Sequence, residues 1–198
     1  MLKNKDLNIL RNLSEIAATR TIFETFKQAI NELTVVDRGT TQVRDRIKIS
    51  QSRPYAVKQQ DYVAAKKSVF NKIVGDSHFE LEFAGFLDGC RDIVSFAKND
   101  RQMNPSLFIE YQNADGSISN YFPDFLVKRS DREIWVIETK GREDLDDPRK
   151  WERLKTWIVD ATARGEGTSY KAMFVREEEW VRRPIATFED AEAAFEVA

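Results

Sequence analysis

The chain has 198 residues, of which 41% are hydrophobic and 32% are charged, a balance typical of a globular domain with a sizeable core. No apolar run approaches the length of a membrane span, and the first residues lack the pattern of a signal peptide. We therefore expect a cytoplasmic protein with no membrane association. The single cysteine, Cys90, excludes an internal disulfide and fits a reducing compartment.

Charge is distributed unevenly along the chain. Residues 1–68 carry a net charge of +6 and residues 69–198 a net charge of −8, which together give the overall −2. A basic flank beside an acidic region is typical of a protein whose polyanionic ligand must approach carboxylates. A solvated basic surface without a ligand gives the same pattern, and both interpretations stay open.

Hydrophobic periodicity predicts that the first part of the chain is mainly helical. Apolar residues recur every three or four positions over 6–33, 61–74 and 77–89, and residues 43–50 alternate as in a short strand. Ser77 is a suitable N-cap for the third helix, and Glu80 three residues later completes a capping-box pattern.

The second part of the chain predicts strands joined by tight turns. We expect three consecutive strands over 107–111, 118–128 and 133–139, then a helix over 147–163, a strand over 170–175 and a short helix over 188–197. Three neighbouring strands, a crossover helix and a fourth strand give a mixed sheet with helices packed against it. The predicted fold class is therefore α/β.

Three charged residues stand at the ends of two of these strands. Asp124 directly precedes the apolar run Phe-Leu-Val, and Glu138 and Lys140 close the run Ile-Trp-Val-Ile-Glu-Thr-Lys. Residues i and i+2 of a strand point to the same face, so Glu138 and Lys140 project together, and antiparallel pairing brings Asp124 beside them. Two carboxylates can hold a hard divalent cation, and an ammonium group can orient a water or stabilise a phosphorane. The pattern predicts metal-assisted phosphodiester hydrolysis; the alternative is ordinary surface charge at exposed strand ends.

Pro123-Asp124 on one strand and Glu138-x-Lys140 on the next, in an αβββαβ order, resemble the PD-(D/E)xK nuclease superfamily. A longer set of motifs, spread over about residues 38–180, resembles the C-terminal endonuclease region of type III restriction enzyme Res subunits. These motifs are the runs at 67–73, 76–87, 96–99, 109–111, 121–125 and 138–141. The resemblance implies a restriction-endonuclease-like domain at 68–198 after a helical, basic segment at 1–67. It also implies a Mg²⁺-dependent DNA endonuclease of restriction systems, with Mn²⁺ as a substitute, that acts in defence against foreign DNA.

The resemblance implies a role for each residue of the site. Asp124, Glu138 and the backbone carbonyl of Thr139 would bind the metal, and Lys140 would be the catalytic lysine. Glu80 on the preceding helix is expected to add a further acid. Glu82 is its rival, helical geometry favours Glu80, and the alternative for Glu80 is helix capping alone.

Contacts with the DNA backbone are predicted for five polar residues: Lys98, Asn99, Arg142, Arg44 and Arg46. His78 is the only histidine in the sequence and is expected at the surface, and the sequence contains no Cys/His cluster of the kind that binds zinc.

The partners implied by the resemblance are double-stranded DNA, a helicase or translocase motor, a methyltransferase subunit and a second copy of the chain. The sequence contains no Gly-x-x-x-x-Gly-Lys-Ser/Thr loop, so we expect either an excised domain or a stand-alone relative, without ATP dependence of its own. Two alternatives remain. One is a catalytically silent nuclease-fold module that binds DNA or a partner, and the other is a resolvase- or transposase-type nuclease of the same superfamily.

Overall fold

The computed structural model describes residues 12, 15–34, 42–43, 45–53, 56–142 and 144–198. The chain divides into two compact units, residues 1–40 with 112–119 and residues 41–111 with 120–198. In the first unit, α2 (Ile16–Thr34) forms much of the predicted N-terminal helix, and residues 6–11 of that prediction lie outside the described part. The domain boundary predicted between residues 67 and 68 stays a prediction. Within the described residues, no helix is both long enough and apolar enough to cross a membrane.

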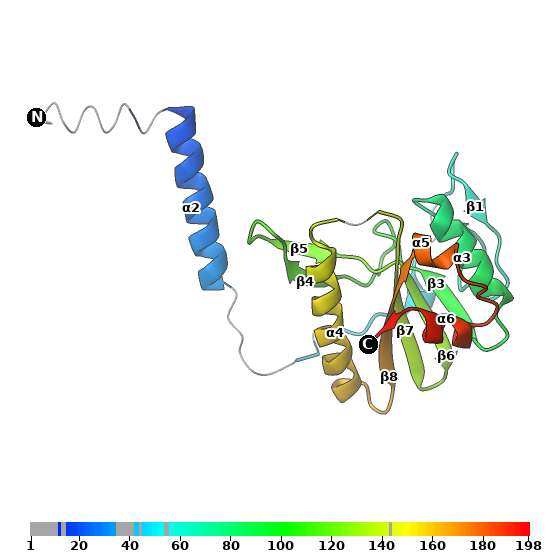
Figure 1. Cartoon of the computed structure of the whole chain (residues 1–198). Helices are drawn as coiled ribbons and strands as arrows, with labels where there is room; N and C mark the ends of the chain where they lie inside the picture. Colours follow the sequence, from blue (N-terminus) through cyan, green and yellow to red (C-terminus); the bar gives the residue numbers. More distant parts are fainter. Residues whose placement is uncertain (1–11, 13–14, 35–41, 44, 54–55, 143) are drawn as a thin grey trace, which may run out of the picture. The chain divides into compact units, whose positions relative to one another are not determined.

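The second unit is built on a five-stranded mixed sheet (Figure 1). Its strands, in spatial order, are β3 (Ser95–Lys98), β6 (Phe125–Ser130), β7 (Glu133–Lys140), β8 (Ser169–Arg176) and β9 (Glu196–Val197). The pairs β3–β6, β6–β7 and β8–β9 are antiparallel, whereas β7 and β8 are parallel. The parallel pair requires a crossover, which α4 (Asp147–Arg164) provides. The mixed sheet flanked by helices confirms the predicted fold class and is consistent with a restriction-endonuclease-like fold.

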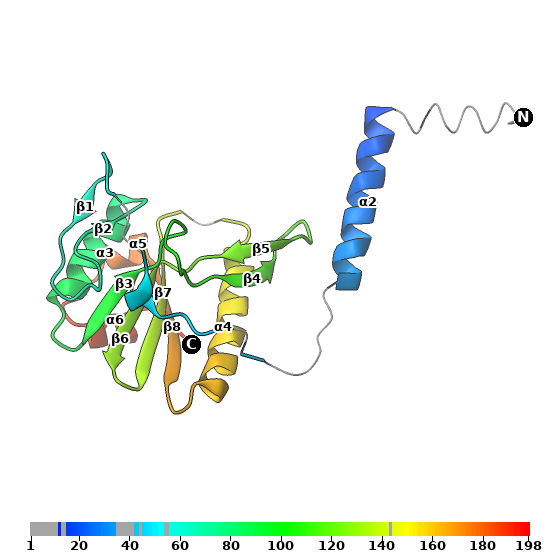
Figure 2. The ribbon, with the colours of Figure 1, turned by 180° about the vertical axis from the view of Figure 1, so that it is seen from behind.

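Helices cover both faces of the sheet (Figures 1 and 2). α4 lies against one face, and α3 (His78–Gly89), α5 (Glu177–Trp180) and α6 (Phe188–Ala194) lie against the other. Residues 134–137 of β7 are all apolar, as expected for a strand that is covered on both faces. Trp135 and Ile137 pack in the core beneath α3 and α6, whereas Val136 packs in the core beneath α4. Continuing this alternation directs Glu138 and Lys140 toward the α4 side at the end of the strand.

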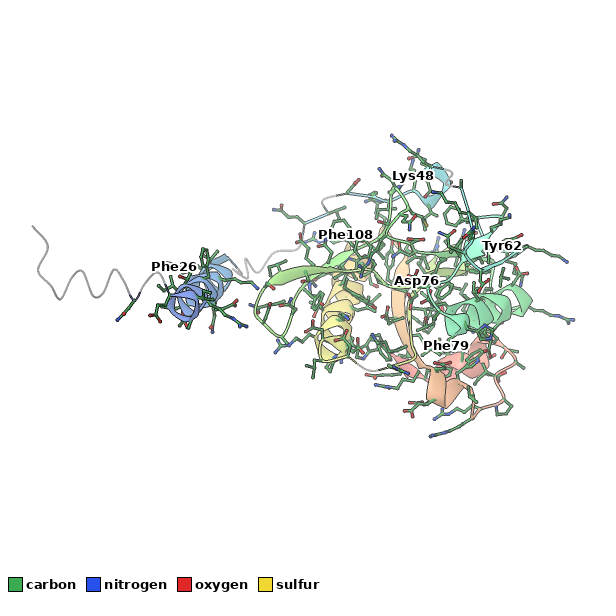
Figure 3. The ribbon with its side chains drawn as sticks, turned by 90° about the horizontal axis from the view of Figure 1, so that it is seen from above. Phe26, Lys48, Tyr62, Asp76, Phe79 and Phe108 are labelled. Atoms are coloured by element: carbon green, nitrogen blue, oxygen red, sulfur yellow. The ribbon has the colours of Figure 1, made fainter. Side chains whose placement is uncertain are left out.

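Local sequence explains where the two main helices begin and end. Ser77 accepts the amide hydrogen of Glu80 and caps α3, whose residue Phe79 turns into the core (Figure 3). α4 has Pro148 in its first turn and ends at Gly165. The apolar side of α4, formed by Trp151, Leu154 and Ile158, faces the sheet.

The expected strand 118–128 is broken into two strands that belong to different sheets. β5 (Ile118–Tyr121) pairs with β4 (Ile109–Gln112), and β6 enters the main sheet only after Phe122, Pro123 and Asp124. Proline lacks an amide hydrogen and cannot donate to a ladder, so it ends the first pairing. On the side away from β7, β6 pairs with β3, a strand that we did not predict. In the sequence, β4 and β5 form an insertion between β3 and β6.

Three other expectations about secondary structure are wrong. Residues 61–74 do not form a helix but contain the antiparallel strands β1 (Tyr62–Val63) and β2 (Ile73–Val74). The expected strand at 43–50 is a 3₁₀ turn, η1 (Ile49–Gln51), preceded in its described part by extended chain. The C-terminal helix ends at Ala194, and the chain continues as β9. Half of the apolar residues of 61–74 are β-branched, and over so short a run periodicity alone does not separate helix from strand.

Candidate active site

The acidic motif lies at one end of the main sheet. Asp124 directly precedes β6, and Glu138, Thr139 and Lys140 are the last residues of β7. Phe125 pairs with Ile137 in the antiparallel register, so continuing the register by one residue places Asp124 opposite Glu138. The structure therefore brings the two acids of the motif to neighbouring strands, as the sequence predicted.

Asp124 is held by donors from two different strands. Its Oδ2 accepts hydrogen bonds from the Thr139 amide at 2.8 Å and the Thr139 hydroxyl at 2.7 Å. Its Oδ1 accepts from Lys98 Nζ at 2.8 Å. A carboxylate offers about two acceptor positions on each oxygen, so Oδ1 keeps one position for a further ligand. The side chain is fixed in orientation but still has room for a cation.

Glu138 is buried, and the charge of Asp124 acts on it. Tyr121 donates its hydroxyl to Oε2 at 2.9 Å, and no donor to Oε1 occurs among the described residues. Burial, and secondly the charge of Asp124, raise the pKa of Glu138 well above its usual range, although the Tyr121 hydrogen bond lowers it. Burial and the Glu138 charge likewise raise the pKa of Tyr121. A carboxylate in this position is stabilised by any cation that binds Oε1.

Glu80 reaches Asp124 through a lysine. Lys98 Nζ lies 2.7 Å from Glu80 Oε2 and 2.8 Å from Asp124 Oδ1, so one ammonium joins α3 to the motif. Burial alone lowers the pKa of Lys98, but the charges of Asp124 and Glu80 outweigh it and raise the pKa above its usual value. Glu82, the rival acid, points elsewhere and accepts from Trp180 Nε1 at 2.8 Å.

Glu80 also caps its own helix, so the two roles that the sequence left open coexist. Its Oε2 accepts the Asp76 amide at 3.0 Å, and its Oε1 accepts the Ser77 hydroxyl at 3.3 Å. With Lys98 added, both acceptor positions of Oε2 are used. The contact with Lys98, at 2.7 Å, is the shortest of the three, so the main partner of Glu80 is Lys98.

Lys140 is paired with an acid that the sequence analysis did not identify. Its Nζ lies 2.9 Å from Asp147 Oδ1, in the first turn of α4, and 3.9 Å from Asp144 Oδ2. Asp147 is buried and also accepts from Lys150 at 3.3 Å. The pair holds the Lys140 ammonium on the α4 side of the sheet, beside the end of β7.

The remaining predicted contacts are spread over the domain. Asn99 is buried, and its side-chain amide bonds the backbone of Leu107 and the carbonyl of Pro123. Arg142 is exposed on the loop after β7, and Arg46 pairs with Glu166 at 2.6 Å. Arg44 lies outside the described residues. The structure thus gives Lys98 and Asn99 partners within the protein, and a DNA contact for any of the five residues stays a prediction.

The chemistry of the donor set fits one divalent cation. Asp124 and Glu138 each keep a free acceptor position, and Mg²⁺ uses few protein carboxylates because it retains several waters. In the described part of the chain, no group of three or more His, Cys, Asp or Glu side chains is arranged to hold a metal ion. A site with three carboxylate ligands is thus not formed in this arrangement, because Lys98 lies between Glu80 and Asp124.

Comparison with known families gives an independent result for this region. Residues 98–171 match the family described as TnsA-like endonuclease N terminal. No curated protein matches, and no solved structure matches.

The matched segment contains most of the site. It begins at Lys98 and includes Asp124, Glu138, Lys140 and Asp147, whereas Glu80 precedes it. The match to TnsA-like endonucleases supports the PD-(D/E)xK nuclease superfamily. It does not support the narrower resemblance to type III Res subunits.

Sequence reasoning missed four interactions in the site. These are the ion pairs of Lys98 and of Asp147, the Tyr121 hydroxyl on Glu138, and the Thr139 hydroxyl on Asp124. Two of them had a local signal, because a tyrosine three residues before Asp124 and a threonine beside Glu138 are hydrogen-bonding groups within the motif itself. The ion pairs of Lys98 join elements that are distant in the sequence, whereas the pair of Lys140 and Asp147 crosses the loop from β7 to α4. No pattern of the sequence indicated either of them.

Proposed function

We propose that this chain is a divalent-metal-dependent DNA endonuclease that hydrolyses phosphodiester bonds. One observation carries the proposal: Asp124 stands opposite Glu138, with Lys140 beside it, at one end of a mixed sheet and inside the segment that matches TnsA-like endonucleases. PD-(D/E)xK nucleases generally use divalent metals, and a buried carboxylate at Glu138, opposite the carboxylate of Asp124, favours a bound cation. Mg²⁺ is the proposed ion, and Mn²⁺ should replace it.

In the proposed reaction each residue has a distinct task. Asp124, Glu138 and the carbonyl of Thr139 hold the cation, which when bound would polarise a phosphate oxygen and lower the pKa of a bound water. Lys140 stabilises the charge that develops on the phosphorane oxygens or orients the attacking water. Thr139 and Tyr121 position the two carboxylates through the hydrogen bonds described above.

Cleavage of supercoiled plasmid tests the activity directly. Wild type, Lys140→Ala and Asp124→Ala would be incubated with DNA in Mg²⁺ or Mn²⁺, with an EDTA control. Lys155→Ala is a matched control, because Lys155 pairs with Glu152 on the surface of α4, away from the motif. We expect nicking or linearisation by wild type and Lys155→Ala, and loss by the two site variants. Equal cleavage by all four proteins would contradict the assignment of the site.

The second candidate is a catalytically silent nuclease-fold module that binds DNA or a partner. The same four proteins, titrated with a fluorescent duplex, separate it from the enzyme. Metal-independent binding with no cleavage by any protein, together with no binding of Mn²⁺ in calorimetry, would favour the module over the nuclease.

The biological setting is a narrower part of the proposal. The family match favours an endonuclease of the TnsA-like kind and is compatible with the resolvase- or transposase-type alternative. A type III restriction setting, with a motor and a methyltransferase as partners, depends on the sequence motifs alone. A restriction role, a second copy of the chain at the DNA and a cytoplasmic location stay predictions. Cleavage of branched against linear DNA of the same sequence would identify a resolvase.

A further inference from the structure

Lys98 is a buried lysine that lies between two carboxylates at the end of the main sheet. Its side chain is only 8% exposed, and its ammonium lies between two carboxylates that are 12% and 16% exposed. One carboxylate, Asp124, belongs to the motif, and the other, Glu80, comes from α3. The two distances, 2.7 Å and 2.8 Å, are those of direct charge-assisted hydrogen bonds.

The surroundings of Lys98 hold the ammonium in this place. Its backbone is in β3, paired with Phe125 of β6, so its Cα is fixed by the main sheet. Its Nζ lies over the ring of the buried Phe125, 5.1 Å from the centroid. Glu80 is held in turn by the amide of Asp76, a residue labelled at the start of α3 in Figure 3. The contact is therefore part of the folded domain and not a mobile surface pair.

The charges of the site balance with a single divalent cation. With every group ionised, five carboxylates and three ammonium groups leave a net charge of −2; these groups are Glu80, Asp124, Glu138, Asp144, Asp147, Lys98, Lys140 and Lys150. One divalent ion neutralises that charge. A second divalent ion would leave an excess of +2, and the oxygens nearest to such an ion on the α3 side already bind an ammonium.

We propose that Lys98 is a resident cation of the active site, which takes the place of a second divalent ion between Glu80 and Asp124. The inference depends on the proposed function, because it assumes that Asp124 and Glu138 bind a divalent ion. It assigns Glu80 to Lys98 and not to the metal, and it makes this nuclease a one-metal enzyme. Lys98 is a positioning residue in this role, since it acts through the two carboxylates.

Counting bound Mn²⁺ tests the inference without any measurement of cleavage. Isothermal titration calorimetry, with electron paramagnetic resonance of free Mn²⁺ as a second readout, would be applied to wild type and Lys98→Met. Methionine keeps much of the side-chain length and removes the charge. We expect one ion per wild-type chain and two per chain of Lys98→Met. Lys140→Met is the matched control, because it removes the other lysine of the site and should still bind one ion.

Two further variants keep the test informative if Lys98→Met folds poorly, which circular dichroism and thermal melting would reveal. Glu80→Gln removes the α3 carboxylate and should still bind one ion, since Glu80 serves Lys98. The double variant Lys98→Met/Glu80→Gln should lose the second ion gained by Lys98→Met. Loss of all binding in Glu80→Gln would overturn the inference, because Glu80 would then be a required ligand.

The outcomes separate this inference from the proposed function. One ion in wild type and one in Lys98→Met, at the same affinity, would overturn the role of Lys98 and leave the nuclease proposal intact. Two ions in wild type would also overturn it. No binding of Mn²⁺ by wild type would contradict the proposed function itself, and the inference would fall with it.

Discussion

Replacing Tyr121 by phenylalanine removes one hydroxyl group and leaves the ring in the core. That hydroxyl donates to Glu138 Oε2 at 2.9 Å, and Tyr121 is only 4% exposed, so bulk water cannot take its place. A hydrogen bond contributes about 1.5–3 kcal/mol when the acceptor is charged and about 0.5–1.5 kcal/mol when both partners are neutral. We expect Tyr121→Phe to lower the free energy of unfolding by the smaller amount at low pH. The loss should approach the larger amount as Glu138 ionises.

A double-mutant cycle with Glu138→Gln isolates this interaction. Urea unfolding would be followed by tryptophan fluorescence in EDTA, at pH 5 and pH 9, for wild type, both single variants and the double variant. In the Glu138→Gln background the acceptor is neutral at every pH, so Tyr121→Phe should cost the same at both pH values. Two results would refute our account of how Glu138 is held. One is that Tyr121→Phe lowers the free energy of unfolding by the same amount at pH 5 and pH 9 in the wild-type background too. The other is a coupling energy of zero.

Three further predictions concern the buried titratable groups and a helix cap. Burial and Asp124 raise the folded-state pKa of Glu138 above its unfolded value, so wild type loses stability in EDTA as the pH rises through the folded pKa. Glu138→Gln should therefore be more stable than wild type at pH 8, by about 0.5–2 kcal/mol, but not at pH 4, and urea unfolding at both pH values checks this. Burial raises the pKa of Cys90 to about 12, so its thiol should react with Ellman's reagent at pH 8 only after denaturant is added. Thr187 and Asp190 form the capping box of α6. Thr187→Ala should lower the free energy of unfolding by about 0.5–2 kcal/mol in the same urea assay. An unchanged urea midpoint would contradict the capping role.

The sequence was sufficient for features that depend on neighbouring residues. The apolar run that ends in Glu138 predicts a strand with charged groups at its end, and the structure has that strand. The capping residue Ser77 and the apolar stripe of α4 are local patterns in the same sense. These features follow from periodicity and hydrogen-bonding chemistry over a few residues, which is why they could be predicted.

The features that escaped prediction depend on contacts between distant parts of the chain. β3 has only four residues, and it is recognisable as a strand through its pairing with β6 rather than through its own pattern. Lys98 ends that strand, and from the sequence alone it resembles an ordinary lysine at the surface. Only the folded structure shows that it lies between Glu80 of α3 and Asp124 of the motif. Pro123 did carry a local signal, because a proline inside an expected strand indicates a break, and the expectation of one continuous strand overlooked it.

Asn99 holds together the two ends of the segment that connects β3 to β6, and this affects which insertions the domain can accept. Its side chain bonds both backbone groups of Leu107 and the carbonyl of Pro123, and its amide donates to the carbonyl of Asp124 at 2.7 Å. One asparagine thus fastens the exit of β3 to the entry of β6. The turn between β4 and β5, residues 113–117, lies outside this connection, so we expect that it can be lengthened, shortened or exchanged without moving Asp124 or the Tyr121 hydroxyl on Glu138. Related domains could therefore differ in this turn and keep the same acidic motif, and a designer could graft a new segment at the same place.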